Sequence, residues 1–330
     1  DFAMIMGYPG RTNRWESSYW VDQNVKYAYP AWVEASKTAM DAMKRFMDKD
    51  DAVRLLYASQ YSSIANYWKN RQGMIDALSA HKTADKKRKA EAKFAKWAKK
   101  AENKAEYGDV LNTLATYFQK TNTLSADQNY LGMLWRASFF IKMPTRYISL
   151  VSGAQRGGMP ADELDKKVDN LLSEYDKINL DVEKAILADM LKLYANKGTD
   201  VPTELKAIKA QYNGNFNKYV EDLLAKSIYR SKETAKEGAK QEAAGLASDP
   251  ILQLSGVLFE GYLNPPPELF NLEDAYSKAY RKFVQGMRNS KASNILYPDA
   301  NSTLRLTYGT VKPLKADKRN PDAKKNFYTT

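Results

Sequence analysis

Residues 1–13 read DFAMIMGYPGRTN, and this stretch has the pattern of β-structure. Its apolar run stops at Gly7, and Tyr8-Pro9-Gly10-Arg11 follows. That tetrapeptide predicts a type II turn, because proline presets φ and glycine accepts a positive φ. Near the other end, residues 302–309 (STLRLTYG) alternate polar and apolar side chains, which predicts a second strand. Two strands alone do not form a stable sheet, so both segments are expected to belong to a larger β-structure.

Between the two strand segments, apolar residues recur at helical spacing. Glycine- and proline-rich loops are predicted at 153–160 (GAQRGGMP) and 261–267 (GYLNPPP). The predicted fold class is mostly α, an irregular helical bundle with short β-strand stubs at both ends. Its helices are predicted over 31–47, 52–78, 82–104, 108–121, 126–152, 161–175, 178–196, 202–211, 214–228, 231–247 and 268–291.

The composition of the 330-residue chain limits the kinds of site and partner that the protein can have. Apolar residues make up 44%, enough for a packed core, but no apolar run approaches the roughly 18 residues of a membrane helix. The absence of cysteine excludes disulfides and thiolate chemistry. A single histidine excludes a histidine-rich metal site, and the sequence contains no calcium-binding loop. We therefore expect no metal, no cofactor and no membrane partner.

The net charge of +12 is concentrated in residues 82–104 (KTADKKRKAEAKFAKWAKKAENK). Apolar residues share one face of the predicted helix, and lysines occupy the rest. This pattern predicts a solvated outer face of a core-packed helix, while a surface for nucleic acid, acidic peptide or lipid stays open as an alternative. Lysine far outnumbers arginine here, which disfavours nucleic acid as a partner because arginine reads bases better.

The search for catalytic groups finds no catalytic residue in this chain. A Ser-His-Asp triad requires a histidine, and the only one, His81, adjoins the lysine-rich segment, whose charge opposes its protonation. The chain contains no nucleophile elbow, phosphate-binding glycine loop, dinucleotide fingerprint or zinc-binding helix motif. The pair Asp50-Asp51 is expected to cap a helix rather than to act as an acid–base pair.

One candidate binding residue remains, Asn66, inside the predicted helix 52–78. Apolar Ile64 and Trp68 flank it at i−2 and i+2, and an asparagine in such surroundings must use its amide. The amide would make either a hydrogen bond to another helix or one to a ligand donor.

Three segments together resemble the bacterial dipeptidyl-peptidase 7 and 11 family, a group of chymotrypsin-fold serine exopeptidases. They are DFAMIMGYPGRTNRW at 1–15, YASQYSSIANYWKN at 57–70 and DANSTLRLTYGTVK at 299–312. The resemblance implies a helical cap domain inserted in a double β-barrel. Residues 1–20 and 296–330 would then belong to the barrel, and residues 21–295 would form the helical domain. The catalytic triad would lie in the barrel, so this chain alone is expected to be inactive.

The same resemblance implies the function. Family members are hydrolases that remove dipeptides from the free N-terminus of oligopeptides, and the helical domain gates access. The family's asparagine that binds the substrate α-ammonium falls on Asn66. Expected partners are an oligopeptide, the β-barrel catalytic domain and a second copy in a homodimer, in the periplasm or at the cell surface of a Gram-negative bacterium. A basic helical nucleic-acid-binding or scaffold module is the alternative.

Overall fold

A computed structural model of the chain describes residues 1–238, 243–263, 267–293 and 297–312. The chain divides into two compact units, one formed by Asp1–Glu16 with Ser293–Thr330 and the other by Ser17–Ala292. The predicted fold class is confirmed, since helices dominate and the described residues contain two short strands.

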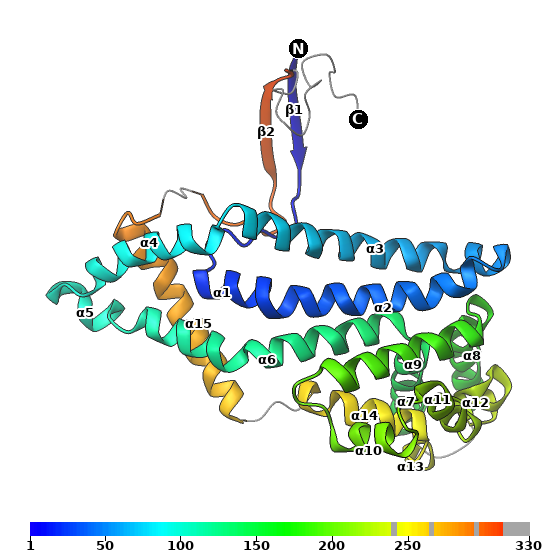
Figure 1. Ribbon diagram of the computed structural model, residues 1–330. Coiled ribbons are helices and arrows are strands. Elements are labelled where there is room, and N and C mark those ends of the chain that lie inside the picture. Colours follow the sequence, from blue (N-terminus) through cyan, green and yellow to red (C-terminus); the bar gives the residue numbers. More distant parts are fainter. Residues whose placement is uncertain (239–242, 264–266, 294–296, 313–330) are drawn as a thin grey trace. The chain divides into compact units, whose positions relative to one another are not determined.

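The smaller unit contains both strands. β1 (Phe2–Gly7) pairs antiparallel with β2 (Arg305–Thr310), with Phe2 opposite Thr310 and Gly7 opposite Arg305 (Figure 1). The two predicted strand segments therefore pair with each other in one ribbon. Most side chains of the ribbon are exposed, because the part of the smaller unit that the structure describes has no third strand beside these two.

The predicted type II turn at Tyr8–Arg11 is wrong. Gly10 does not adopt a positive φ, which a type II turn requires at this position. The segment instead bonds to the other end of the chain: Ser302 N–H donates to the Pro9 carbonyl (3.0 Å), and Thr12 N–H donates to the Ala300 carbonyl (3.4 Å). Because that end supplies the backbone partners, the segment does not need to turn on itself.

The larger unit is an irregular helical bundle. Helices α2, α3 and α6 run side by side, with α2 in the middle, and α9 also packs on α2 (Figure 1). Its helices are α1 (Ser18–Gln23), a π-helical segment (Asn24–Ala28), α2 (Tyr29–Met47), α3 (Asp51–Ala80), α4 (Thr83–Ala98), α5 (Ala101–Tyr107), α6 (Val110–Ala137), α7 (Phe139–Gly157), α8 (Ala161–Leu172), α9 (Leu180–Lys197), α10 (Thr203–Gln211), α11 (Phe216–Ala225), α12 (Lys232–Gly238), α13 (Ala243–Leu246), α14 (Pro250–Leu263) and α15 (Pro267–Asn289), with 3₁₀ turns at Ser173–Lys177 and Ile228–Arg230.

The face that α2 presents to the core is rich in small residues. Ala31, Ala35, Ala39 and Ala42 are buried at three- and four-residue spacing, and Met43 fills the remaining space. Small side chains at the contact shorten the distance between helix axes, which lets α3, α6 and α9 all approach α2. The alanine face of α2 therefore sets the centre of the bundle.

The structure corrects three predicted helix boundaries. The break predicted at 122–125 is wrong: α6 is continuous there, and Gln23 Nε2 donates to Thr121 Oγ1 (3.0 Å), so this polar mid-helix residue bonds to a neighbouring element instead of ending the helix. The break falls at Ser138, whose backbone is extended. The predicted loop at 153–160 begins too early, because α7 continues to Gly157 and ends where Gly158 adopts a positive φ.

Two further expectations need correction. The lysine-rich segment is not one helix, because α4 ends at Ala98 and α5 begins at Ala101. The predicted loop at 261–267 is helical where it is described, since α14 extends to Leu263 and α15 starts at Pro267, where a proline is tolerated in the first turn. Residues 264–266 lie outside the described residues.

Candidate functional site

Helix α3 carries the predicted binding residue, and one of its faces is exposed. Asp50 begins the helix as its N-cap, with Oδ1 accepting from Ala52 N–H (2.8 Å). Only Val53, Tyr57 and Ile64 of its thirty residues are buried, and all three lie on one side of the helix. The opposite side is open across most of the helix length.

Asn66 lies on the open side of α3. It follows Ile64 by two residues, which places it about 200° further around the helix axis, facing away from the core. Asn66 is exposed, and no hydrogen bond among the described residues uses its side-chain amide. Of the two uses that the sequence left open for this amide, a hydrogen bond to another helix is therefore not made, and the amide is available to a ligand.

Two side chains next to Asn66 are held in place by Arg136, from the last turn of α6. Arg136 Nη2 donates to Ser63 Oγ (2.9 Å), and its guanidinium lies 4.3 Å from the centre of the Tyr67 ring. Ser63 is three residues before Asn66 and therefore its neighbour on the helix surface. Sequence reasoning missed Arg136, since nothing local marks a residue whose role depends on α6 reaching α3.

A second cluster of polar groups surrounds Glu183, on the buried side of α3. Glu183 Oε1 accepts from the Tyr57 hydroxyl and Oε2 accepts from Phe139 N–H, both at 2.9 Å. Burial raises the pKa of Glu183 to about 7, although these two hydrogen bonds and nearby Lys142 oppose the shift. The carboxylate thus satisfies the first backbone N–H of α7 and joins α3, α7 and α9.

A cavity of about 220 Å³ adjoins this cluster and is lined partly by Gln60, Lys142 and Glu183. Gln60 Nε2 donates to the Ala137 carbonyl, and Lys142 Nζ donates to the Arg136 carbonyl. Burial lowers the pKa of Lys142. Gln60, Lys142 and Glu183 are thus already bonded to the end of α6 or the start of α7, which indicates a structural junction rather than a binding site.

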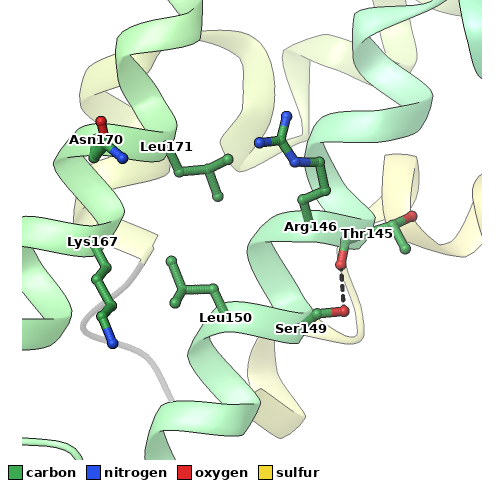
Figure 2. A pocket seen from close by; sticks show the side chains of 7 residues that line it. All are labelled: Thr145, Arg146, Ser149, Leu150, Lys167, Asn170 and Leu171. Carbon is green, nitrogen blue, oxygen red and sulfur yellow. Dashed lines mark hydrogen bonds between the residues drawn. The ribbon is translucent and has the colours of Figure 1, made fainter.

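A larger hollow of about 460 Å³ lies between α7 and α8. Figure 2 shows Leu150 and Leu171 pointing into the space between the two helices, and Ser149 bonded back to its own helix at Thr145. Arg146 is engaged by Glu174 (2.6 Å), and Lys167 by Glu163 (2.8 Å). Because its cations are paired with carboxylates, the hollow offers no free charge to a ligand.

Three further features bear on the function: the position of His81, the grouping of metal-ligand side chains and the apolar character of the helices. His81 is exposed at the C-terminal end of α3, as expected for a helix-terminal histidine. Within the described ranges, no three histidine or carboxylate side chains gather as metal ligands would. In the same part of the chain, no helix has the length and apolar character needed to cross a membrane.

Comparison with known proteins identifies the class. The whole chain, residues 1–330, matches the Peptidase S46 family, and the chain therefore belongs to that family of peptidases. Dipeptidyl-peptidase 7 of Capnocytophaga gingivalis is 57% identical over 100% of this chain and 46% of its own length. The Asp/Glu-specific dipeptidyl-peptidase of Flavobacterium psychrophilum is 27% identical over 94% of this chain and 44% of its own length.

Solved structures agree on the fold. The crystal structure of Porphyromonas endodontalis DPP11 in complex with the dipeptide Arg-Asp matches with a TM-score of 0.77 at 23% identity, covering 96% of this chain and 46% of that one. The same protein in complex with the dipeptide Arg-Glu matches with a TM-score of 0.76. This chain spans less than half the length of the relatives it matches.

Proposed function

We propose that this chain is the helical substrate-gating part of a serine-type dipeptidyl aminopeptidase, and that Asn66 binds the α-ammonium of the peptide substrate. Membership of the Peptidase S46 family and 57% identity to a dipeptidyl-peptidase 7 support the activity. The exposed, unbonded amide of Asn66 is the observation that supports the assignment of this residue to substrate binding.

The peptide α-ammonium and the side-chain amide of Asn66 are chemically complementary. A peptide α-ammonium has three N–H donors and no acceptor, and the amide oxygen of Asn66 is an acceptor without charge. A neutral acceptor binds the ammonium through a charge-assisted hydrogen bond without forming a permanent ion pair. Its neighbours at i−4 and i−3 on α3 are the small side chains of Ser62 and Ser63, so an approaching chain end meets little steric obstruction on that side.

The bond-breaking groups belong, in this proposal, to the part of the protein outside this chain. The only histidine, His81, is exposed at a helix end and is not oriented by a carboxylate among the described residues. The purified chain should therefore hydrolyse no dipeptide amide. The proposal also includes the remaining partners and the location: a β-barrel catalytic domain, a homodimer, and the periplasm or cell surface of a Gram-negative bacterium.

The test of Asn66 is Asn66→Ala in the full-length enzyme, with Asn70→Ala as the matched control. Losing one charge-assisted hydrogen bond of about 1.5–3 kcal/mol should lower kcat/KM on free dipeptide amides by roughly 10- to 150-fold. Asn70 is also exposed on α3, so its removal should change little.

N-acetylated substrates provide the second comparison. The wild-type enzyme should reject them, because an acetylated N-terminus lacks the ammonium. The Asn66 variant should discriminate less between free and acetylated peptides, since it has already lost the interaction. Wild-type kcat/KM in both asparagine variants would show that Asn66 does not bind the substrate.

A further inference from the structure

A row of lysines runs along the exposed side of α4. Lys86, Lys89, Lys93 and Lys96 recur at alternating spacings of three and four residues, all of them exposed. At 100° and 1.5 Å per residue, they lie within an arc of about 80° along roughly 15 Å of helix. Lys82 before the helix and Lys100 after it keep the same spacing. We call these six residues the lysine row.

The acids of this segment are engaged elsewhere. Asp85 pairs with Arg88 (3.1 Å), and Arg88 also pairs with Asp22 (2.6 Å). Glu91 is buried, where it accepts hydrogen bonds from the backbone N–H and the hydroxyl of Ser18. Among the described residues, no carboxylate lies within ion-pair distance of any ammonium in the lysine row.

Several surface lysines elsewhere in the bundle are paired with carboxylates. Lys37, Lys44 and Lys218 each pair with the aspartate four residues further along the chain, and Lys278 pairs with the aspartate four residues before it. In the lysine row, each lysine has another lysine three or four positions away, and like charges at these spacings destabilise a helix. Electrostatic repulsion therefore remains between the ammonium groups of the row, and a bound anion would reduce it.

We propose that the lysine row docks the protein on the surface of an anionic lipid bilayer. The row runs along the exposed outer side of a helix. A flat surface can therefore contact all of its ammonium groups at the same time. Ammonium groups act as point charges that attract lipid phosphates without directional geometry. The apolar side of α4, including Phe94 and Ala98, is buried in the bundle, so the contact is electrostatic and does not insert.

The same residues disfavour nucleic acid as the partner. Base reading relies on arginine, and the one arginine of α4, Arg88, is held by two aspartates. Stacking on unpaired bases needs a free ring, but Trp97 packs against Tyr107 with ring centres 4.9 Å apart. A peripheral contact requires no spanning helix, and the proposal departs in this respect from the expectation that no membrane is a partner.

The test is sedimentation of the full-length protein with vesicles of phosphatidylcholine containing about one third phosphatidylglycerol, against pure phosphatidylcholine vesicles. The wild-type protein should bind only the anionic vesicles and should dissociate when NaCl is raised from about 0.05 to 0.5 M. The variant Lys86→Gln/Lys89→Gln/Lys93→Gln/Lys96→Gln should bind roughly 600-fold more weakly, since each of the four lysines near an anionic surface contributes about a fivefold factor. The control, Lys37→Gln/Lys44→Gln/Lys218→Gln/Lys278→Gln, removes the same charge and should bind nearly as well as wild type.

Several results would overturn the proposal. Equal binding of wild type to both vesicle types would show that the lysine row does not recognise anionic lipid. An equal loss in the control variant would show that net charge alone is responsible. Tighter binding to a duplex DNA probe than to the anionic vesicles at the same salt concentration would assign the row to nucleic acid. Circular dichroism and unchanged kcat/KM of both variants establish that they fold.

Discussion

Glu183 and Ser138 show how much an individual polar side chain depends on its partners. Glu183 is buried yet accepts hydrogen bonds from Tyr57 and Phe139, so both oxygens are used. Ser138 is equally buried at the junction of α6 and α7, but its hydroxyl has no partner among the described residues. Substitutions of Glu183 and of Ser138 should therefore have opposite effects on the free energy of unfolding.

The first prediction concerns the pH dependence of stability through Glu183. Burial raises its pKa in the folded protein from 4.5 to about 7, so between these values the folded state binds the proton and the unfolded state does not. The contribution of Glu183 to stability is therefore fully present below about pH 4.5 and is lost as pH rises through 7. Relative to Glu183→Gln, the free energy of unfolding of the wild-type chain should fall by up to roughly 1.4 kcal/mol per pH unit in this window.

Urea denaturation at a series of pH values measures this difference directly. Glutamine keeps the shape of the side chain but does not titrate, so every other titrating group cancels in the comparison. A difference in unfolding free energy that stays constant from pH 4.5 to 8 would contradict the prediction.

The second prediction compares two fully buried serines. Ser138→Ala should change the free energy of unfolding by less than about 0.5 kcal/mol or raise it, because the lost hydroxyl makes no hydrogen bond. Ser227→Ala should cost about 1–3 kcal/mol, because its hydroxyl donates to Asp249 and accepts from Tyr229 N–H. Thermal or urea unfolding of the two variants gives the ranking, and the reverse order would contradict it.

At the scale of helices, close approach decides where glycine is required. Gly286 lies inside α15, and an added Cβ there would come within 2.4 Å of Phe94 and 3.0 Å of Tyr107. Gly73 lies inside α3, and nothing would stand within 4 Å of its added Cβ. Replacing either glycine by alanine brings the same gain in helix propensity. The difference in unfolding free energy between the two variants therefore measures packing alone.

The third prediction follows from that pair. Gly73→Ala should stabilise the chain by up to about 1 kcal/mol, since alanine favours the helix and meets no obstacle. Gly286→Ala should destabilise it by about 1–3 kcal/mol despite the same gain in propensity, because the methyl group must displace Phe94. Unfolding curves of the two variants decide the matter, and stabilisation by Gly286→Ala would show that α15 does not pack closely on α4 and α5.

At the scale of the whole molecule, the two units differ in how well they can stand alone. The larger unit has a continuous core that includes Met43, Ile64 and Leu134. The ribbon of β1 and β2 exposes Ile5, Met6 and Tyr308, each by more than half of its surface. A two-stranded ribbon without a covering layer is at best marginally stable in water.

The fourth prediction is therefore a contrast in hydrogen exchange. In the isolated chain, the amides of residues 2–7 and 305–310 should exchange within seconds, whereas those of α2 and α9 should be protected by many orders of magnitude. In the full-length protein, the ribbon should gain protection if a host sheet covers it. Strong protection of the ribbon in the isolated chain would contradict the interpretation that it belongs to a larger β-structure.

The sequence by itself determined the fold class, the two strands near the ends of the chain and the exposed lysines. Hydrophobic periodicity and alternation are local signals, and they reflect which side of an element faces the core. The three segments that resemble the dipeptidyl-peptidase 7 and 11 family, one of which contains Asn66, also pointed to the family that the comparisons show. The assignment of Asn66 to substrate binding stays a prediction.

Only the tertiary structure decided where the helices break and which polar groups are free. Gln23 bonds to Thr121 in the middle of α6, and Glu183 reaches the Phe139 N–H at the start of α7 from α9. The exposure of the Asn66 amide and the contact of Arg136 with α3 likewise depend on how the helices are arranged. These features come from residues distant in sequence, and periodicity within one helix carries no information about its partner.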